Sequence, residues 1–345
     1  MAKWQRVTPV AAVAGALLVL VLVGRWLASP APRERAPVAP KPTTATTATT
    51  RPSPIVATVR LPAAEGEIAA LAFDGGSVWV ADQAGGALLR VDPEANRVVS
   101  RIRMGEPQAG PWGMVAAGGG VWASFEEGTV WRIDSRTGKV TDKLPVLNIG
   151  SFAVGDGALW SPCCETERPK SSGRVTRVDL ATRRVTAKIG IKGNPYTAAV
   201  AGNSVWVAGS LPNSMWRIDP ARQTVSTVKE GYARSTTLRM AAGLGALWIG
   251  NPDELLKIDP GTGRVLATIG LPGRPVGLAL GLDAVWVSTD TGALVRVDPA
   301  TGRVAASLQL PEVGSLGSLA VTPDAVWAAS GRSILRIDPA RLRAA

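Results

Sequence analysis

The chain has 345 residues, 46% of them hydrophobic, a formal net charge of +11 at pH 7 and no histidine. The missing imidazole excludes Ser-His-Asp and Cys-His catalysis and most zinc sites. The first 53 residues hold seven basic residues and one acid, so they carry +6 of the charge. No run of Lys or Arg in the rest resembles a nucleic-acid-binding stripe, and we predict no nucleic-acid partner.

Residues 7–24, VTPVAAVAGALLVLVLVG, form a long apolar segment flanked by Lys3, Arg6 and Arg25. A cleaved signal peptide would need a small-residue cleavage site, and the options are poor because Ala28 has the bulky Trp26 at its −3 position. An uncleaved signal-anchor fits the length, at the short end of the membrane-spanning range. We therefore predict a membrane helix within residues 1–28, with secretion after cleavage as the alternative.

Residues 29–53 are rich in Pro, Ala and Thr and predict a disordered, extended linker, because this composition cannot build a hydrophobic core. An apolar helix, a Pro/Thr-rich spacer and a globular head are typical of a head displayed outside the membrane. The expected location is the cell membrane, single-pass, with the head extracytoplasmic.

From residue 54 onward one phrase recurs: a Gly-rich step, then "VW" or a close variant, then about ten residues later a basic residue, Ile or Val, and Asp. A period near 40 residues with short alternating strands is typical of β-propeller blades. The repeat tryptophans are Trp79, Trp122, Trp160, Trp206, Trp248, Trp286 and Trp327, and the matching aspartates are Asp92, Asp134, Asp179, Asp219, Asp259, Asp298 and Asp338.

One unit, residues 275–311, divides into four short apolar runs separated by Gly, Asp and Pro, which predicts a four-stranded antiparallel sheet. The last copy stops after its third run, and residues 54–62, PIVATVRLP, match the missing fourth. We predict an all-β fold for residues 54–345: a seven-bladed β-propeller closed by three C-terminal strands and one N-terminal strand.

The phrases GSVWVAD, NSVWVAG and DAVWVST, each followed by RIDP or RVDP, resemble the virginiamycin B (streptogramin) lyase-like propellers and the related YVTN and NHL repeats. The resemblance covers residues 54–345 and implies the propeller fold. It also implies a lyase that uses histidine and glutamate with magnesium, which a chain without histidine cannot reproduce. A lyase-like, metal-assisted enzyme remains the alternative function, with Tyr196 as acid or base and Glu126, Glu127 or Asp253 on a metal.

The repeat aspartates precede turns, so we interpret them as turn caps rather than a ring of catalytic acids. The tryptophans are interpreted as packing between neighbouring blades. No catalytic residue, metal site or cofactor is assigned; the paired carboxylates Glu126 and Glu127 are interpreted as a solvated turn.

Function in propellers usually lies on the face that bears the loops entering each blade. There the sequence departs from the repeat at Asn194 and Tyr196 before blade 4, Arg234 and Ser235 before blade 5, and Arg274 before blade 6. Convergent amide, phenol and guanidinium groups predict a binding site, and two arginines favour an anionic ligand. The alternative is that these are ordinary solvated loop residues.

The longest insertion, SPCCETERPKSSGR, contains the adjacent Cys163 and Cys164. Outside the cytoplasm they could form a vicinal disulfide; a reduced dithiol or a metal contact are the alternatives. Vicinal disulfides also occur in propellers that bind pyrroloquinoline quinone, but the docking motifs of those proteins are absent. The favoured function is a membrane-anchored binding module for a small anionic ligand or a protein partner.

Overall fold

The structure is a computed structural model that describes residues 52–61, 68–104, 110–111, 113–125, 128–146, 151–164, 172–210, 213–230, 239–310 and 316–342. Residues 51–345 form one compact unit. The predicted membrane segment and nearly all of the predicted linker lie outside the described residues. The described residues contain no helix long and apolar enough to span a membrane.

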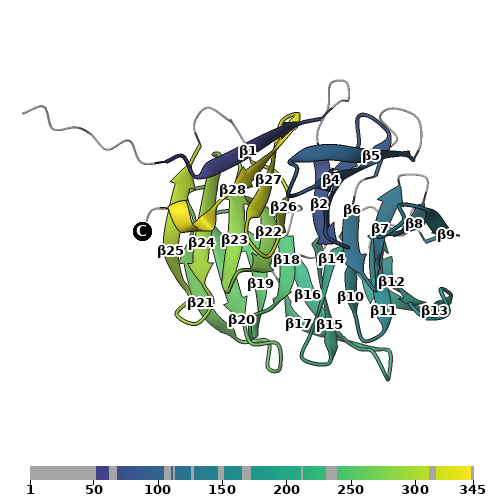
Figure 1. The fold of residues 1–345 in the computed structure, drawn as a ribbon. Coiled ribbons are helices and arrows are strands. Elements are labelled where there is room, and N and C mark those ends of the chain that lie inside the picture. Colours follow the sequence, from purple (N-terminus) through teal and green to yellow (C-terminus); the bar gives the residue numbers. More distant parts are fainter. Residues whose placement is uncertain are drawn as a thin grey trace, which may run out of the picture. The chain divides into compact units, whose positions relative to one another are not determined.

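The described residues form seven four-stranded antiparallel sheets, which are the seven blades of a β-propeller (Figure 1). Blade 1 consists of β2 (Ile68–Asp74), β3 (Ser77–Asp82), β4 (Ala87–Asp92) and β5 (Arg97–Arg103). Blade 2 consists of β6 (Gly113–Ala117), β7 (Gly120–Phe125), β8 (Thr129–Asp134) and β9 (Val140–Leu144). Blade 3 consists of β10 (Ala153–Gly155), β11 (Ala158–Cys164), β12 (Ser172–Asp179) and β13 (Val185–Lys192).

Blade 4 consists of β14 (Asn194–Ala201), β15 (Ser204–Ser210), β16 (Ser214–Asp219) and β17 (Thr224–Glu230). Blade 5 consists of β18 (Arg239–Gly243), β19 (Ala246–Asn251), β20 (Glu254–Ile258) and β21 (Val265–Gly270). Blade 6 consists of β22 (Pro275–Gly281), β23 (Ala284–Thr289), β24 (Ala293–Asp298) and β25 (Arg303–Gln309). Blade 7 combines β26 (Leu319–Val321), β27 (Val326–Ser330) and β28 (Ser333–Ile337) with β1 (Ile55–Arg60), and a 3-10 helix, η2 (Pro339–Arg341), follows.

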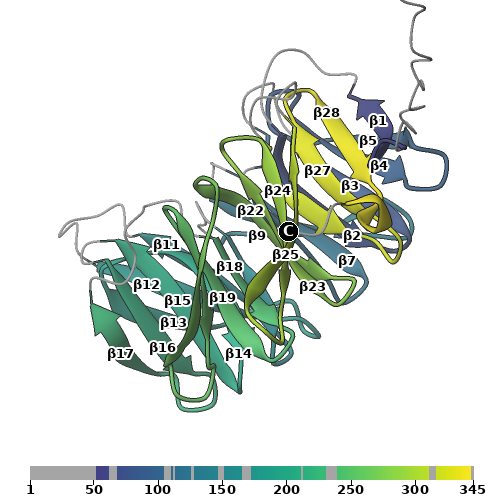
Figure 2. The ribbon, with the colours of Figure 1, turned by 90° about the vertical axis from the view of Figure 1, so that its left-hand side faces the viewer.

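The first strand of each blade is the innermost, and it contacts the first strands of the neighbouring blades. These contacts run from β2 through β6, β10, β14, β18 and β22 to β26, and from β26 back to β2, so the ring is closed. Figure 2 shows the blades as separate fans of strands within this unit. The predicted number of blades is confirmed.

The predicted closure is present in blade 7. The N-terminal strand β1 pairs antiparallel with β28, in register from Arg60 opposite Ser333 to Ile55 opposite Ile337, with one irregularity beyond Ala57. Two further backbone bonds extend the seam: the Asp338 amide donates to the Pro54 carbonyl, and the Leu61 amide to the Arg332 carbonyl. The closure leaves β28 with a partner on each side, so no blade lacks its fourth strand.

The seven repeat tryptophans are at most 1% exposed and lie between neighbouring blades. Trp327 of blade 7 packs with Val80 and Leu89 of blade 1, and Trp160 of blade 3 packs with Val205 of blade 4. A tryptophan is large enough to span the widening space between two blades and to bury a large apolar area there. The interpretation of these residues as interblade packing is confirmed.

The repeat aspartates cap the turns that follow the third strand of each blade. In Asp259 one carboxylate oxygen accepts from the Gly261 and Thr262 amides, at 2.9 and 2.7 Å, and from the Thr262 hydroxyl. Hydrogen bonds from these groups lower the pKa of Asp259, and the pKa of Asp92, Asp134, Asp179, Asp219 and Asp298 is lowered in the same way. The turn-cap interpretation is confirmed.

Candidate ligand-binding face

The propeller has two faces with different kinds of loop. The top face bears the loops that enter each blade and the turns between the second and third strands. The bottom face bears the turns between the first and second strands and between the third and fourth strands. The chain enters the propeller at the bottom face, where Pro54 lies beside Asp338. The predicted ligand-binding residues that the structure describes, Asn194, Tyr196 and Arg274, belong to the top face by their position along the strands.

The bottom face is repetitive, and its basic side chains serve the fold. In each blade the basic residue of the third strand lies opposite the repeat tryptophan, with its charged group 5.6–5.9 Å from the ring centroid. Several of these side chains also reach the next blade. Arg90 donates to the Arg136 carbonyl at 3.0 Å, and Lys257 donates to the Pro299 carbonyl at 2.8 Å. Cations bound in this way are already engaged within the ring.

Asn194 and Tyr196 lie at the start of β14, the innermost strand of blade 4, and both are partly buried. The pairing of β14 with β15 is irregular between Pro195 and Thr197, so Tyr196 is the extra residue of a bulge. Its carbonyl accepts from the Ser151 amide of blade 3 at 3.0 Å. A bulge turns a side chain out of the regular alternation of its strand, which suits a position at the rim of the ring.

Arg274 lies directly before β22, the innermost strand of blade 6, and its side chain is 51% exposed. Its Nε is 3.3 Å from Oδ2 of Asp290, and its backbone amide donates to the other carboxylate oxygen at 2.9 Å. The positive charge of Arg274 is therefore already balanced within its own blade. Arg234 and Ser235 lie outside the described residues, so the structure brings together only part of the predicted cluster.

Arg239, at the start of β18 in blade 5, belongs to the same rim and was not among the residues predicted from the sequence. It is partly buried, and its Nε donates to the Val276 carbonyl of blade 6 at 2.7 Å. Burial lowers the pKa of this guanidinium. Arg239 could have been recognised as a departure from the repeat. In each blade one residue of the first strand pairs with the repeat tryptophan, and in blade 5 Arg239 lies two residues before it. The equivalent residues of the other blades are small: Ala70, Gly113, Ser151, Thr197, Gly277 and Ser318.

Both cysteines lie at the end of β11, with Cys163 opposite Arg174 and Cys164 opposite Gly173 of β12. Cys163 is fully buried. The side chain of Cys164 is outside the description, and the vicinal disulfide stays a prediction. The insertion is thus anchored at its start by regular strand pairing rather than by a loop conformation.

The metal-assisted alternative would need carboxylates gathered near Tyr196. Glu126 and Glu127 lie outside the described residues. Asp253 is exposed in the turn between β19 and β20, where its carbonyl accepts from the Leu271 amide at 3.0 Å. Within the described ranges no three Cys, Asp or Glu residues gather as a metal site would require.

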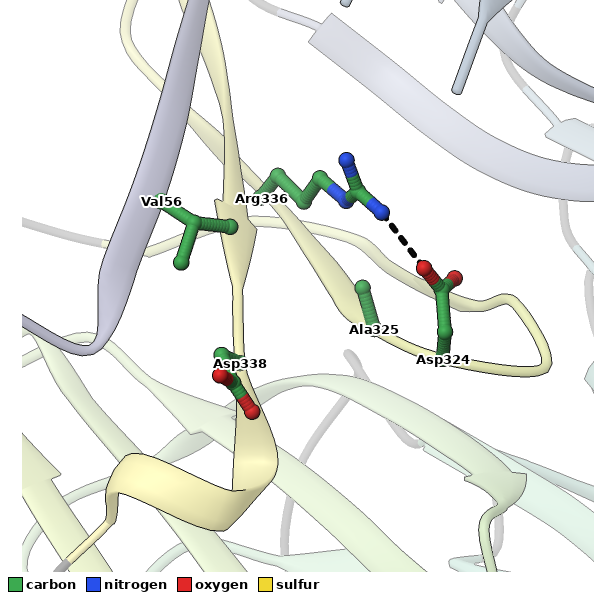
Figure 3. Close-up of a pocket in the computed structure, with 5 residues that line it drawn as sticks. All are labelled: Val56, Asp324, Ala325, Arg336 and Asp338. Carbon is green, nitrogen blue, oxygen red and sulfur yellow. Dashed lines mark hydrogen bonds and ion pairs between the residues drawn. The ribbon is translucent and has the colours of Figure 1, made fainter. Parts of the chain in front are cut away.

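A cavity of about 270 Å³ lies on the bottom face at the closing seam, lined by Val56, Asp324, Ala325, Arg336 and Asp338 (Figure 3). Arg336 points toward Asp324, and the two form an ion pair. Asp338 caps η2 through the Ala340 amide and pairs with Arg341. Because each of its charged groups already has an ion-pair partner, this cavity is explained by the junction between strands from the two ends of the propeller.

Comparisons with known proteins bear on the fold alone. No family model matches the chain, and no curated protein matches it. Among solved structures, the computationally designed protein Ika8 is similar, with a TM-score of 0.57 and 14% sequence identity. The match covers 81% of this chain and 98% of Ika8. The resemblance to the streptogramin lyase-like and YVTN or NHL repeats therefore stays an expectation from sequence.

Proposed function

We propose that this chain is a membrane-anchored, extracytoplasmic propeller that binds an anionic ligand or a partner protein on its top face. Propellers serve often as binding scaffolds, and the chemistry of each is set by its loops rather than by the repeat. The membrane anchor and the location rest on the apolar segment 7–24 and the linker at 29–53.

The observation that carries the proposal is the contrast between the two faces. On the bottom face the aspartates cap turns and the basic residues stack on tryptophans, blade after blade. On the top face three consecutive innermost strands carry side chains that depart from the repeat. Tyr196 is the third residue of β14, Arg239 is the first residue of β18, and Arg274 lies directly before β22. Departures from a repeat that the fold does not require are where function is expected.

The test is thermal unfolding of the full chain in detergent with a panel of anionic cell-wall fragments, sugars and cyclic depsipeptides. A ligand that binds only the folded state raises Tm by mass action. We expect a shift for at least one anionic ligand that Tyr196→Phe or Arg274→Ala reduces. The matched control is Arg222→Ala, an exposed arginine paired with Asp219 on the bottom face. A shift that only the bottom-face variant reduces would overturn the proposed face.

The location is tested separately. Cells expressing the full chain are fractionated and treated with protease before lysis. We expect the propeller in the membrane fraction and accessible to the protease, whereas recovery in the soluble cytoplasmic fraction would contradict the proposed anchoring.

A further inference from the structure

Three junctions between blades have a similar hydrogen bond near the top of the ring. A carbonyl at the start of an innermost strand accepts a bond from the preceding blade. The Ser151 amide donates to the Tyr196 carbonyl, and the Ser288 hydroxyl donates to the Gly317 carbonyl. At the junction of blades 5 and 6 the donor is Nε of Arg239, and the acceptor is the Val276 carbonyl. A single neutral donor is therefore sufficient at this place in the fold.

Arginine supplies far more than this bond requires. A guanidinium carries five N–H donors in a rigid fork, and the junction uses one of them. No other hydrogen bond or ion pair of Arg239 is present in the part of the chain that the structure describes. The equivalent positions of the other blades hold only Ala, Gly, Ser or Thr. The remaining donors on the two Nη atoms are thus not explained by the packing of the ring.

Within the described residues the charge of Arg239 also has no ion-pair partner. Arg274 has Asp290 and Arg336 has Asp324, but the described residues place no carboxylate beside Arg239. Arg217 of blade 4, which also has no ion pair among the described residues, donates to both Ser204 and Gly261 and stacks on Trp206. Removing a charge from water is costly unless a counter-charge or several hydrogen bonds replace the water. Arg239 is only partly buried, and its Nη atoms are not among the buried side-chain atoms left without a partner, so within the described residues these donors stay open to solvent.

The ring leaves little room for a side chain on the facing strand. Arg239 lies opposite Gly250 of β19, and a Cβ on Gly250 would come within 2.8 Å of the Pro275 ring of blade 6. The interface between blades 5 and 6 is therefore closely packed beside the start of the Arg239 side chain.

We propose that Arg239 is an oxyanion-binding residue, and that its free Nη donors take the oxygens of a phosphate or carboxylate group at the junction of blades 5 and 6. The planar fork of arginine matches the paired oxygens of both groups. This inference deepens the proposed function by naming the ligand chemistry and the residue that receives it. Arg274, already paired with Asp290, has a secondary role in this arrangement.

The probe is inorganic phosphate, titrated onto the full chain in detergent at constant ionic strength against chloride, with Tm as the readout. Acetate and sulfate are titrated in the same way, to distinguish binding of carboxylates from binding of tetrahedral oxyanions. We expect phosphate affinity to fall by about ten-fold or more in Arg239→Gln, because the bonds lost involve a charged group. In the control Arg217→Gln, which removes another interblade guanidinium, affinity stays within about two-fold of the wild type.

An equal phosphate shift in wild type and Arg239→Gln would overturn the inference, as would the absence of any shift with all three oxyanions. If Arg239→Gln does not fold, Arg239→Lys keeps the charge, and we expect it to weaken phosphate binding without abolishing it; unchanged affinity in that variant would contradict the forked contact. A panel ligand that depends on Tyr196 while no oxyanion binds would sink this inference and leave the proposed function standing. Binding of phosphate through Arg239 with a silent panel would support this inference, and with it an anionic ligand on the top face other than the panel compounds.

Discussion

The guanidinium of Arg217 in blade 4 donates through Nη1 to the carbonyl oxygen of Gly261 in blade 5, at 2.9 Å. Its Nε donates to the Ser204 hydroxyl at 2.7 Å, and its charge lies 5.7 Å from the Trp206 ring centroid. One side chain thus joins the third strand of its blade, the tryptophan that packs the interface, and the turn of the next blade. The basic residue of the repeat is an interblade link as well as part of a strand.

Replacing Arg217 by methionine tests this link. Arg217→Met keeps much of the apolar stem but leaves the Gly261 carbonyl and the Ser204 hydroxyl without their donor. We expect a loss of about 1–3 kcal/mol in the free energy of unfolding, measured by urea denaturation of the full chain. Arg222→Met is the control, because that side chain is 79% exposed and makes only an i,i+3 ion pair, worth about 0–1 kcal/mol. Equal losses in the two variants would contradict an interblade role.

The turn caps predict how stability depends on pH. Hydrogen bonds from Thr262 and Gly261 lower the pKa of Asp259 in the folded chain below the ordinary value of 3.8. The stabilisation from this carboxylate is therefore fully present above pH 3.8 and is lost as the pH falls through the lower folded pKa. Six repeat aspartates act in the same direction, so Tm should be nearly constant around neutrality and fall below about pH 4.

The variant for this prediction is Asp259→Ala, followed by thermal unfolding at several pH values. We expect a lower Tm than wild type at neutral pH and a difference that shrinks toward pH 3, as the wild-type carboxylate takes up its proton. Asp253→Ala is the matched control, since the Asp253 carboxylate makes no hydrogen bond in the described part of the chain. A Tm difference for Asp259→Ala that stays constant with pH would exclude the proposed cap.

The fold could be predicted from the sequence because every blade has the same local sequence pattern. A large tryptophan, a Gly-rich turn before it and an Asp-initiated turn after it recur about every 40 residues, and each of these features favours one local structure. The closure followed from counting strands at the two ends, and β1 indeed pairs with β28.

The candidate site could be predicted only in part, because it depends on which side chains the ring brings together. Nothing in the sequence near Arg274 indicates that its charge is balanced by Asp290, which follows 16 residues later across the blade. Arg239 stands just inside a strand, so the departures of the loops from the repeat did not indicate it. Its partner Val276 belongs to another blade, and such a contact appears only once the innermost strands are placed side by side.

The closing seam gives a prediction about assembly. A chain that lacks residues 1–61 loses β1, so β28 has an open edge and blade 7 has three strands. We expect this truncation to be much less stable or aggregation-prone, because an unpaired edge templates further strand pairing. A synthetic peptide of residues 52–61 should restore Tm when added in trans. A chain starting at residue 52 is the control and should unfold as the full propeller does; full stability without β1 would contradict the seam.

The turns between first and second strands provide a prediction of increased stability. Leu244 and Gly245 both have positive φ, 51° and 76°, at a place where blades 1 and 2 have two glycines. A leucine in this left-handed conformation is strained by about 1–2 kcal/mol, whereas asparagine tolerates it.

Leu244 is 38% exposed and outside the buried core, so Leu244→Asn gives up only part of the burial of a core leucine. We expect it to raise the free energy of unfolding by about 1 kcal/mol, measured by urea denaturation. Gly245→Ala is the opposing control: a Cβ there would meet no atom within 4 Å, so any loss reports backbone strain alone. We expect Gly245→Ala to lower the free energy of unfolding by about 1 kcal/mol. The two variants should therefore change stability in opposite directions. A destabilised Leu244→Asn would mean that the leucine side chain contributes more through packing than its backbone conformation costs.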